Sequence, residues 1–98
     1  MPGHTPSRAP SRELLLANHQ FPGSYVIKAF GPAEGGFAAE IEAAAVDIVG
    51  DARANVQQRT SSRGNKVCVT VTVNAFTVDE VIDIYERVHQ VPDLRMIL

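Results

Sequence analysis

Cys68 is the only cysteine in the chain, and its thiol is the side chain most suited to covalent chemistry. A thiol becomes a nucleophile when a nearby base or positive charge lowers its pKa. Of the three histidines, His4 lies in a proline-rich segment, and His19 and His89 lie near the ends of predicted helices. We therefore predict that Cys68 is a partly covered strand thiol, that no residue is catalytic and that the protein is not an enzyme. An enzyme with a base beside Cys68 is the alternative.

Metal and cofactor sites have no pattern to support them in this sequence. Iron–sulfur clusters and copper carriers need paired cysteines, and this chain has one. The three histidines have no carboxylate or cysteine at the spacing of a metal motif. We therefore predict no metal and no cofactor.

The segment GPAEGG is a candidate ligand-binding loop, with Gly31, Glu34, Gly35 and Gly36 as its candidate residues. It leads directly into a predicted helix, whose first amides are unpaired and carry partial positive charge. Glu34 could meet the amine of an amino-acid ligand. The same acid opposes a phosphate cradle, and the loop has no arginine, which argues against an acylphosphatase-like enzyme. The alternative is that these glycines only permit a tight connection.

The elements that would hold these residues follow from hydrophobic periodicity. Residues 67–76 alternate valines with polar side chains, as in a strand that is buried on one face, and a turn around Gly64 precedes them. Thr77 and Glu80 have the spacing of a capping box at the start of a helix. We expect strands at 24–31, 55–60, 67–76 and 94–98, helices from about 37 to 49 and after Thr77, and one or two helical turns at 13–20 before the chain reaches Pro22.

This order, β-α-β-β-α-β, predicts an α+β fold of the ferredoxin-like, split βαβ type. Its four-stranded antiparallel sheet has the order 4-1-3-2, with both helices on one face. Alternation along each strand places Met96 and Leu98 towards the helices. The other face is left open, and we expect it to carry Val26, Lys28, Phe30, Arg59, Thr70, Thr72, Arg95 and Ile97.

Three cations without a carboxylate make this open face a candidate partner surface in a protein whose net charge is −2. Such a mixture of apolar and cationic side chains suits a protein partner, a second copy of the chain, or a small anionic ligand. A solvated face, normal for antiparallel sheets, is the alternative. RNA-binding sheets display stacking aromatics, whereas Phe30 is the only aromatic residue here, so nucleic acid is disfavoured.

Composition limits the setting of the protein. Residues 1–12 contain three of the six prolines and no apolar period, so we predict a disordered tail followed by a single domain at 13–98. No apolar run approaches the roughly 20 residues of a membrane span. A single cysteine suits a reducing compartment, and we expect a cytoplasmic protein.

Five short motifs occur in an order that resembles one family: FPGSYVIKAFG, a helix opening at Phe37, RTSSRGNKVCVTVTVNA, IYERV and the terminus LRMIL. Together they are similar to YbeD-like bacterial proteins, a domain-of-unknown-function family, over residues 21–98. The chain departs from the family pattern at Val67 and Cys68, where an aromatic residue usually follows the turn.

The resemblance implies the fold derived above and a kinship with ACT domains, which are regulatory modules that hold amino-acid effectors near the first strand-to-helix loop. It implies no established chemistry. We therefore expect a small regulatory or binding module that docks on a metabolic protein or senses a metabolite. An adaptor that uses the open face alone is the alternative.

Overall fold

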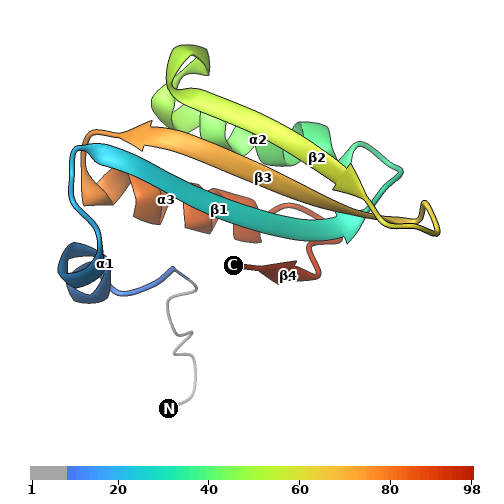
Figure 1. The fold of residues 1–98 in the computed structure, drawn as a ribbon, viewed down its shortest axis with the longest axis horizontal. Helices are drawn as coiled ribbons and strands as arrows, with labels where there is room; N and C mark the ends of the chain where they lie inside the picture. The colour runs from blue at the N-terminus through green and yellow to red at the C-terminus, as the bar shows by residue number, and fades with distance from the viewer. Residues whose placement is uncertain (1–8) are drawn as a thin grey trace.

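The computed structural model describes residues 9–98 of the chain. Its elements follow one another as α1 (Arg12–Asn18), β1 (Gly23–Pro32), α2 (Phe37–Val49), a 3-10 turn η1 (Asp51–Arg53), β2 (Ala54–Thr60), β3 (Lys66–Ala75), α3 (Val78–His89) and β4 (Met96–Ile97). In Figure 1 the sheet lies in front, with α2 and α3 behind it. This arrangement is the predicted ferredoxin-like fold, and α1 occurs where one or two helical turns are expected, at residues 13–20.

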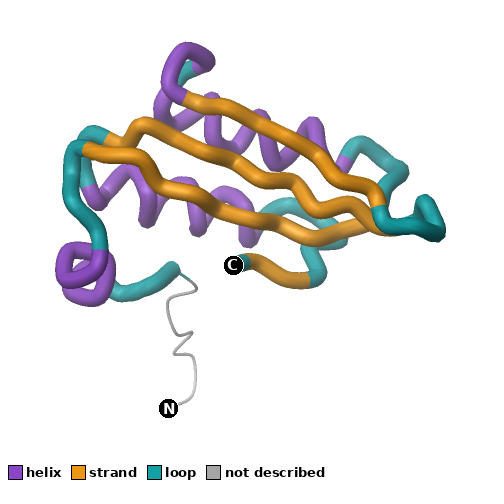
Figure 2. The backbone as a smooth tube through the Cα atoms, in the orientation of Figure 1, coloured by secondary structure: helices purple, strands orange, loops and turns teal. Residues whose placement is uncertain are grey.

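The four strands form one antiparallel sheet in the order β2-β3-β1-β4, which confirms the predicted order. The two long strands, β1 and β3, pair along their whole length, from Gly23 opposite Ala75 to Pro32 opposite Lys66. Both helices that follow a strand cross one face, and the other face of the sheet is open to the viewer in Figure 2. The open face is therefore a broad surface on which side chains from all four strands can meet.

The core lies between the sheet and the two long helices. Alternate residues of β1 and β3 point towards the helices, and Ile27, Val69 and Val71 are at most 1% exposed. Ile41 of α2 and Val81 of α3 pack against them with no exposed surface. This burial explains why the valines of β3 alternate with polar side chains, because successive strand residues point to opposite faces.

The hairpin between β2 and β3 turns where the sequence predicts it. Gly64 has a φ of 79°, and its amide donates to the Ser61 carbonyl at 2.8 Å. The Ser61 amide donates to the Lys66 carbonyl at 2.8 Å and so closes the end of the ladder. A residue with a side chain rarely adopts this left-handed conformation, so the prediction of a glycine-dependent turn is confirmed.

The structure describes only the last part of the predicted disordered tail, residues 1–12. Residues 1–8 of the predicted tail lie outside the described residues. Ala9 is buried, the Ser11 hydroxyl accepts a hydrogen bond from the Leu14 amide, and Leu15 of α1 is 2% exposed. Arg12 forms an ion pair with Asp79 of α3. The packed structure therefore begins before the predicted boundary at residue 13.

The faces of β4 are the reverse of the prediction. Ile97 pairs with Ala29 and packs against the core, so it does not belong to the open face. Met96 pairs with Phe30 and is 49% exposed, and Leu98 is 61% exposed. The strand has only two residues, so alternation within 94–98 carries little information. Its register is decided by pairing with β1 instead.

Candidate functional site

The open face is organised in rows that run across the strands. One row joins Arg59 of β2, Cys68 of β3, Phe30 of β1 and Met96 of β4. The next row places Thr70 between Gln57 and Lys28, and the row after that places Thr72 between Asn55 and Val26. Seven of the eight predicted open-face residues therefore lie on one surface or at its border. Arg95 is at the border, just before β4, and Ile97 is the one residue that lies elsewhere.

An open groove of about 800 Å³ crosses the hairpin end of this surface. Its floor includes Phe30, Cys68 and Met96, and Arg59 and Arg95 lie on its opposite sides. The complete lining is Phe30, Gly31, Pro32, Arg59, Thr60, Ser61, Ser62, Asn65, Lys66, Val67, Cys68, Arg95 and Met96. None of these side chains is acidic.

Sequence reasoning overlooked Lys66 and Met96 as members of this site. Lys66 is an exposed residue at the first position of β3 and has the same parity as Cys68, so alternation could have placed it on the open face. The prediction excludes Lys66 because it begins the strand at Val67. It also places Met96 in the core, whereas the pairing of β4 with β1 places Met96 on the open face. Both errors concern strand ends, where local patterns are weakest.

Charge is strongly segregated in the molecule. Within residues 9–98, no strand contains an aspartate or glutamate, and every acid lies on a helix or a connecting segment. Three cations, Arg12, Arg53 and Arg87, form ion pairs with carboxylates. The other cations of the described chain have no salt bridge and lie on the open face or its hairpin: Lys28, Arg59, Arg63, Lys66 and Arg95.

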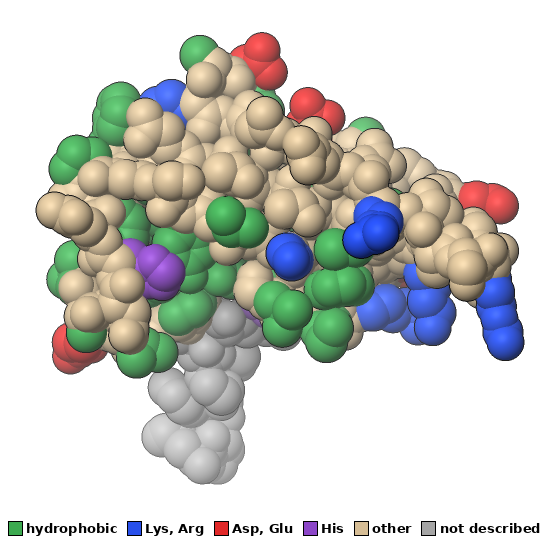
Figure 3. All heavy atoms as spheres, in the orientation of Figure 1, with side chains coloured by type: hydrophobic (Ala, Val, Ile, Leu, Met, Phe, Trp, Pro, Cys, Tyr) green, Lys and Arg blue, Asp and Glu red, His purple; other side chains and the backbone are tan. Residues whose placement is uncertain are grey.

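Figure 3 shows this face of the molecule. Lys and Arg side chains gather over the middle and the hairpin end of the sheet, next to a cluster of hydrophobic side chains, whereas Asp and Glu side chains lie around the rim. Val26 adds an exposed apolar side chain, with 47% of its surface accessible. The face thus combines positive potential with apolar area, which is the composition expected of a partner surface.

The predicted ligand loop is separated from this groove, apart from its first two residues, Gly31 and Pro32. Gly31 lies within β1, where an added Cβ would stand 2.5 Å from the ring of Phe37, so the space beside it is filled. Gly35 and Gly36 have left-handed φ angles of 85° and 81° and connect the loop to α2. Glu34 is exposed. The geometry of the three glycines is that of a tight connection to a buried helix start.

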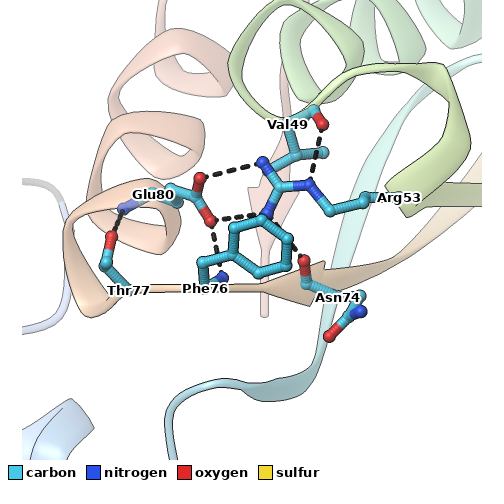
Figure 4. A network of polar contacts seen from close by, with 6 residues as sticks. All are labelled: Val49, Arg53, Asn74, Phe76, Thr77 and Glu80. Carbon is cyan, nitrogen blue, oxygen red and sulfur yellow. Dashed lines mark hydrogen bonds and ion pairs between the residues drawn. The ribbon is translucent and has the colours of Figure 1, made fainter.

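The most elaborate polar cluster lies at the opposite end of the sheet from the hairpin (Figure 4). Arg53 donates two 2.9 Å hydrogen bonds to the carboxylate of Glu80, and further bonds of 3.0 Å to the carbonyls of Val49 and Asn74. The Phe76 ring lies 3.7 Å from the guanidinium carbon. Both charged side chains are about one-fifth exposed.

The hydrogen bonds of Arg53 join η1 to α2, β3 and α3, and those of Glu80 and Thr77 cap the start of α3. Glu80 accepts from the Phe76 amide at 2.7 Å, and the Thr77 hydroxyl accepts from the Glu80 amide at 3.4 Å, which confirms the predicted helix cap in its essentials. The hydrogen bonds from Arg53 hold the pKa of the Glu80 carboxyl below its ordinary value. The hydrogen bonds to Glu80 in turn raise the pKa of the Arg53 guanidinium. Because its donors and acceptors satisfy one another, we interpret the cluster as a structural clamp.

A second buried polar contact joins β1 to α3. The hydroxyls of Tyr25 and Tyr85 lie 3.1 Å apart, and their rings meet edge to face with centroids 6.1 Å apart. Burial, together with the hydrogen bond that the Tyr85 hydroxyl shares with Tyr25, raises the pKa of Tyr85 well above its ordinary value. Both residues lie on the core side of the sheet and have no access to the groove.

Metal-binding clusters and membrane-spanning helices are both absent from the described residues. No group of three or more histidine, cysteine, aspartate or glutamate side chains is arranged to hold a metal ion within residues 9–98. In the same part of the chain, no helix has the length and apolar character needed to cross a membrane.

Residues 17–98 match the sequence model of a protein family whose description is "Protein of unknown function (DUF493)". The chain belongs to the DUF493 family. This finding confirms the resemblance to YbeD-like proteins, and the structure is consistent with the expected likeness to the ACT fold. No curated protein matches the sequence. In this DUF493 member the groove, the cations around it and the apolar floor all lie within the matched region.

Proposed function

We propose that this DUF493 protein is a non-catalytic, ACT-like regulatory module that docks on a partner protein through its open sheet face. The observation that carries the proposal is the segregation of charge. Within residues 9–98, five cations have no salt bridge and border or occupy this face, although the sequence has a net charge of −2. Cations that are not used within the fold are available to a negatively charged partner.

The apolar side chains of the same face support docking of a macromolecule. Val26, Met96 and Leu98 are each about half exposed or more. Covering such residues removes apolar surface from water, and this gain is the main favourable term in protein association. The cations would then guide the approach and orientation of the partner, because charge complementarity governs association rate and specificity.

Docking through the sheet has more support than effector binding at the loop between β1 and α2. The space beside Gly31 is taken by Phe37, and Glu34 is exposed outside the groove. A metabolite sensor remains the alternative form of the proposal. A thermal-shift screen of amino acids and small carboxylates tests it, since saturating binding to the folded protein raises the melting temperature.

The docking proposal is tested by reversing one charge. Lys28→Glu should abolish capture of the partner from the native cell extract, and stability should change by no more than ~0–1 kcal/mol because the side chain is exposed. Arg87→Glu is the matched control, because it makes the same change in net charge on the helix layer. Capture by the unaltered protein should also weaken as salt is raised.

A second variant separates docking on another protein from self-association. If the face joins two copies of the chain through its apolar residues, Val26→Asp should dissociate a dimer in sedimentation experiments and Lys28→Glu should have little effect. If neither variant changes sedimentation or partner capture, the open face is only a solvated sheet surface and the proposal is wrong.

A further inference from the structure

Four cations surround one apolar pair at the hairpin end of the open face. Phe30 and Cys68 lie opposite each other on β1 and β3. Across the strands they are flanked by Arg59 on β2 and by Arg95, which immediately precedes Met96 of β4. Along the strands, Lys28 lies two residues from Phe30 in one direction and Lys66 two residues from Cys68 in the other. We call these four cations, Lys28, Arg59, Lys66 and Arg95, the basic ring.

The dimensions of the basic ring follow from sheet geometry. Lys28 is level with Thr70, so it lies four residue positions along the strands from Lys66, or about 13 Å at 3.3–3.4 Å per residue. Arg59 and Arg95 are separated by three strand spacings, or about 14 Å. A ligand that uses opposite cations therefore carries its negative charges roughly 13 Å apart, with an apolar group between them.

We propose that the basic ring and its groove bind an extended acidic segment of a partner protein. In an extended chain, alternate side chains face the same way at intervals of about 6.7 Å, so positions i and i+4 are about 13 Å apart. Acidic residues at these positions would meet Lys28 and Lys66, and an apolar residue at i+2 would cover Phe30 and Met96. This inference rests on the proposed docking function and names the chemical class of the partner.

Other anionic ligands match the basic ring less well. A single phosphate or carboxylate matches the basic ring less well, because it meets opposite cations only when their long side chains converge above the groove. A nucleic acid would need stacking platforms, and Phe30 is the one aromatic side chain of the groove. Residues 1–8 of this chain carry Arg8 and no acid, so their charge has the wrong sign. A second copy of the chain could offer its acidic α3, but a basic-face-to-helix contact is head-to-tail and builds a ring or a filament rather than a symmetric pair.

The test uses a synthetic peptide whose central leucine has a glutamate two residues away on each side. Fluorescence anisotropy measures the binding of this peptide to the protein. The wild-type protein should bind this peptide, and replacing the glutamates by lysine, or the leucine by serine, should abolish binding. Lys66→Glu and Arg59→Glu should each weaken binding about 5- to 30-fold, because each removes one attraction and adds one repulsion. Arg87→Glu should bind like the wild type.

Cys68 reports independently on where the peptide lies, since it is the only cysteine and lines the groove. With the peptide at ten times its Kd, alkylation of Cys68 by iodoacetamide should slow about tenfold, because the free fraction falls by that factor. The lysine-containing peptide should not slow it. Circular dichroism of each variant confirms that the comparison is between folded proteins.

The possible results separate the two proposals. Absence of peptide binding, or binding without protection of Cys68, overturns the acidic-segment inference, whereas the docking proposal stands if partner capture still depends on Lys28. Tighter binding of a single-stranded oligonucleotide than of the peptide assigns the basic ring to nucleic acid and overturns the inference. Concentration-dependent self-assembly abolished by Lys66→Glu assigns it to a second copy and also overturns it.

Discussion

Gly31→Ala is predicted to destabilise the protein because the methyl group would enter space that the ring of Phe37 already fills. An ideal Cβ at position 31 stands 2.5–2.6 Å from three ring atoms, whereas carbon atoms normally approach to about 3.5–4.0 Å. The overlap is therefore about 1 Å. Phe37 is 2% exposed at the first position of α2, so the ring cannot swing into solvent without leaving the core.

The expected cost is about 1–3 kcal/mol, the usual range for overpacking a core, reduced by the ~0.4–1 kcal/mol that alanine returns through the unfolded chain. Urea denaturation followed by far-ultraviolet circular dichroism measures the loss. For a protein of this size, a loss of 2 kcal/mol lowers the urea midpoint by about 1–2 M.

Repeating Gly31→Ala in a protein that also carries Phe37→Leu identifies the cause of the lost stability. If the clash with the ring is responsible, Gly31→Ala should cost at least about 1 kcal/mol less in a Phe37→Leu protein, because the two positions are in contact and their effects are coupled. An equal loss in both backgrounds, or a stabilised Gly31→Ala protein, would refute this reasoning. It would then reopen a ligand-binding role for Gly31.

Three further predictions concern other parts of the fold. Gly64→Ala should lower stability by about 1–2 kcal/mol through its left-handed φ of 79° alone, since nothing lies within 4 Å of its Cβ position, and a stabilised variant in the same urea assay would contradict this. Leu15→Ala should cost about 2–5 kcal/mol, because Leu15 is 2% exposed, and an unchanged midpoint would show that α1 is not part of the folding unit. Glu80→Gln should be less stable than the wild type at neutral pH, with the gap closing as pH falls below about 4. The pKa of Glu80 is lowered in the folded state, so its contribution is present above the ordinary value of 4.5 and is lost as pH falls through the folded value. A gap that stayed constant in urea melts from about pH 7 to 3 would show that the ion pair with Arg53 is not its source.

The family match also informs the regulatory interpretation. A kinship with ACT-like folds is compatible with many activities, because one fold supports unrelated functions and the site decides among them. In this chain the groove and the cations around it lie on the open face, at the hairpin end. The experiments on Lys28 and Lys66 therefore carry more weight for function than the topology does.

Much of the fold could be predicted from local sequence patterns. The alternation in β3, the glycine at the hairpin and the cap at Thr77 each depend on a few neighbouring residues, and all three occur in the structure. The candidate site was predicted in outline for the same reason, since parity along β1 and β3 places Lys28, Phe30 and Thr70 on one face.

The errors arose where long-range contacts decide the outcome. Ile97 packs inward because β4 pairs with β1 in one register, and two residues are too few to reveal that register by themselves. The ion pair between Arg53 and Glu80 joins residues 27 positions apart in the chain, so no local pattern announces it. The burial of Ala9 and Leu15 likewise depends on packing against the rest of the domain.

The sequence by itself determined which faces of the long strands are apolar, because side chains alternate across a strand whatever the strand pairs with. It also determined that the strands carry no acid. Only the tertiary structure decided that four cations, from three strands and from the segment just before β4, surround Phe30 and Cys68, and that a groove opens between them. Such a site depends on strand order and register, which are set by the packing of the whole sheet rather than by any one segment.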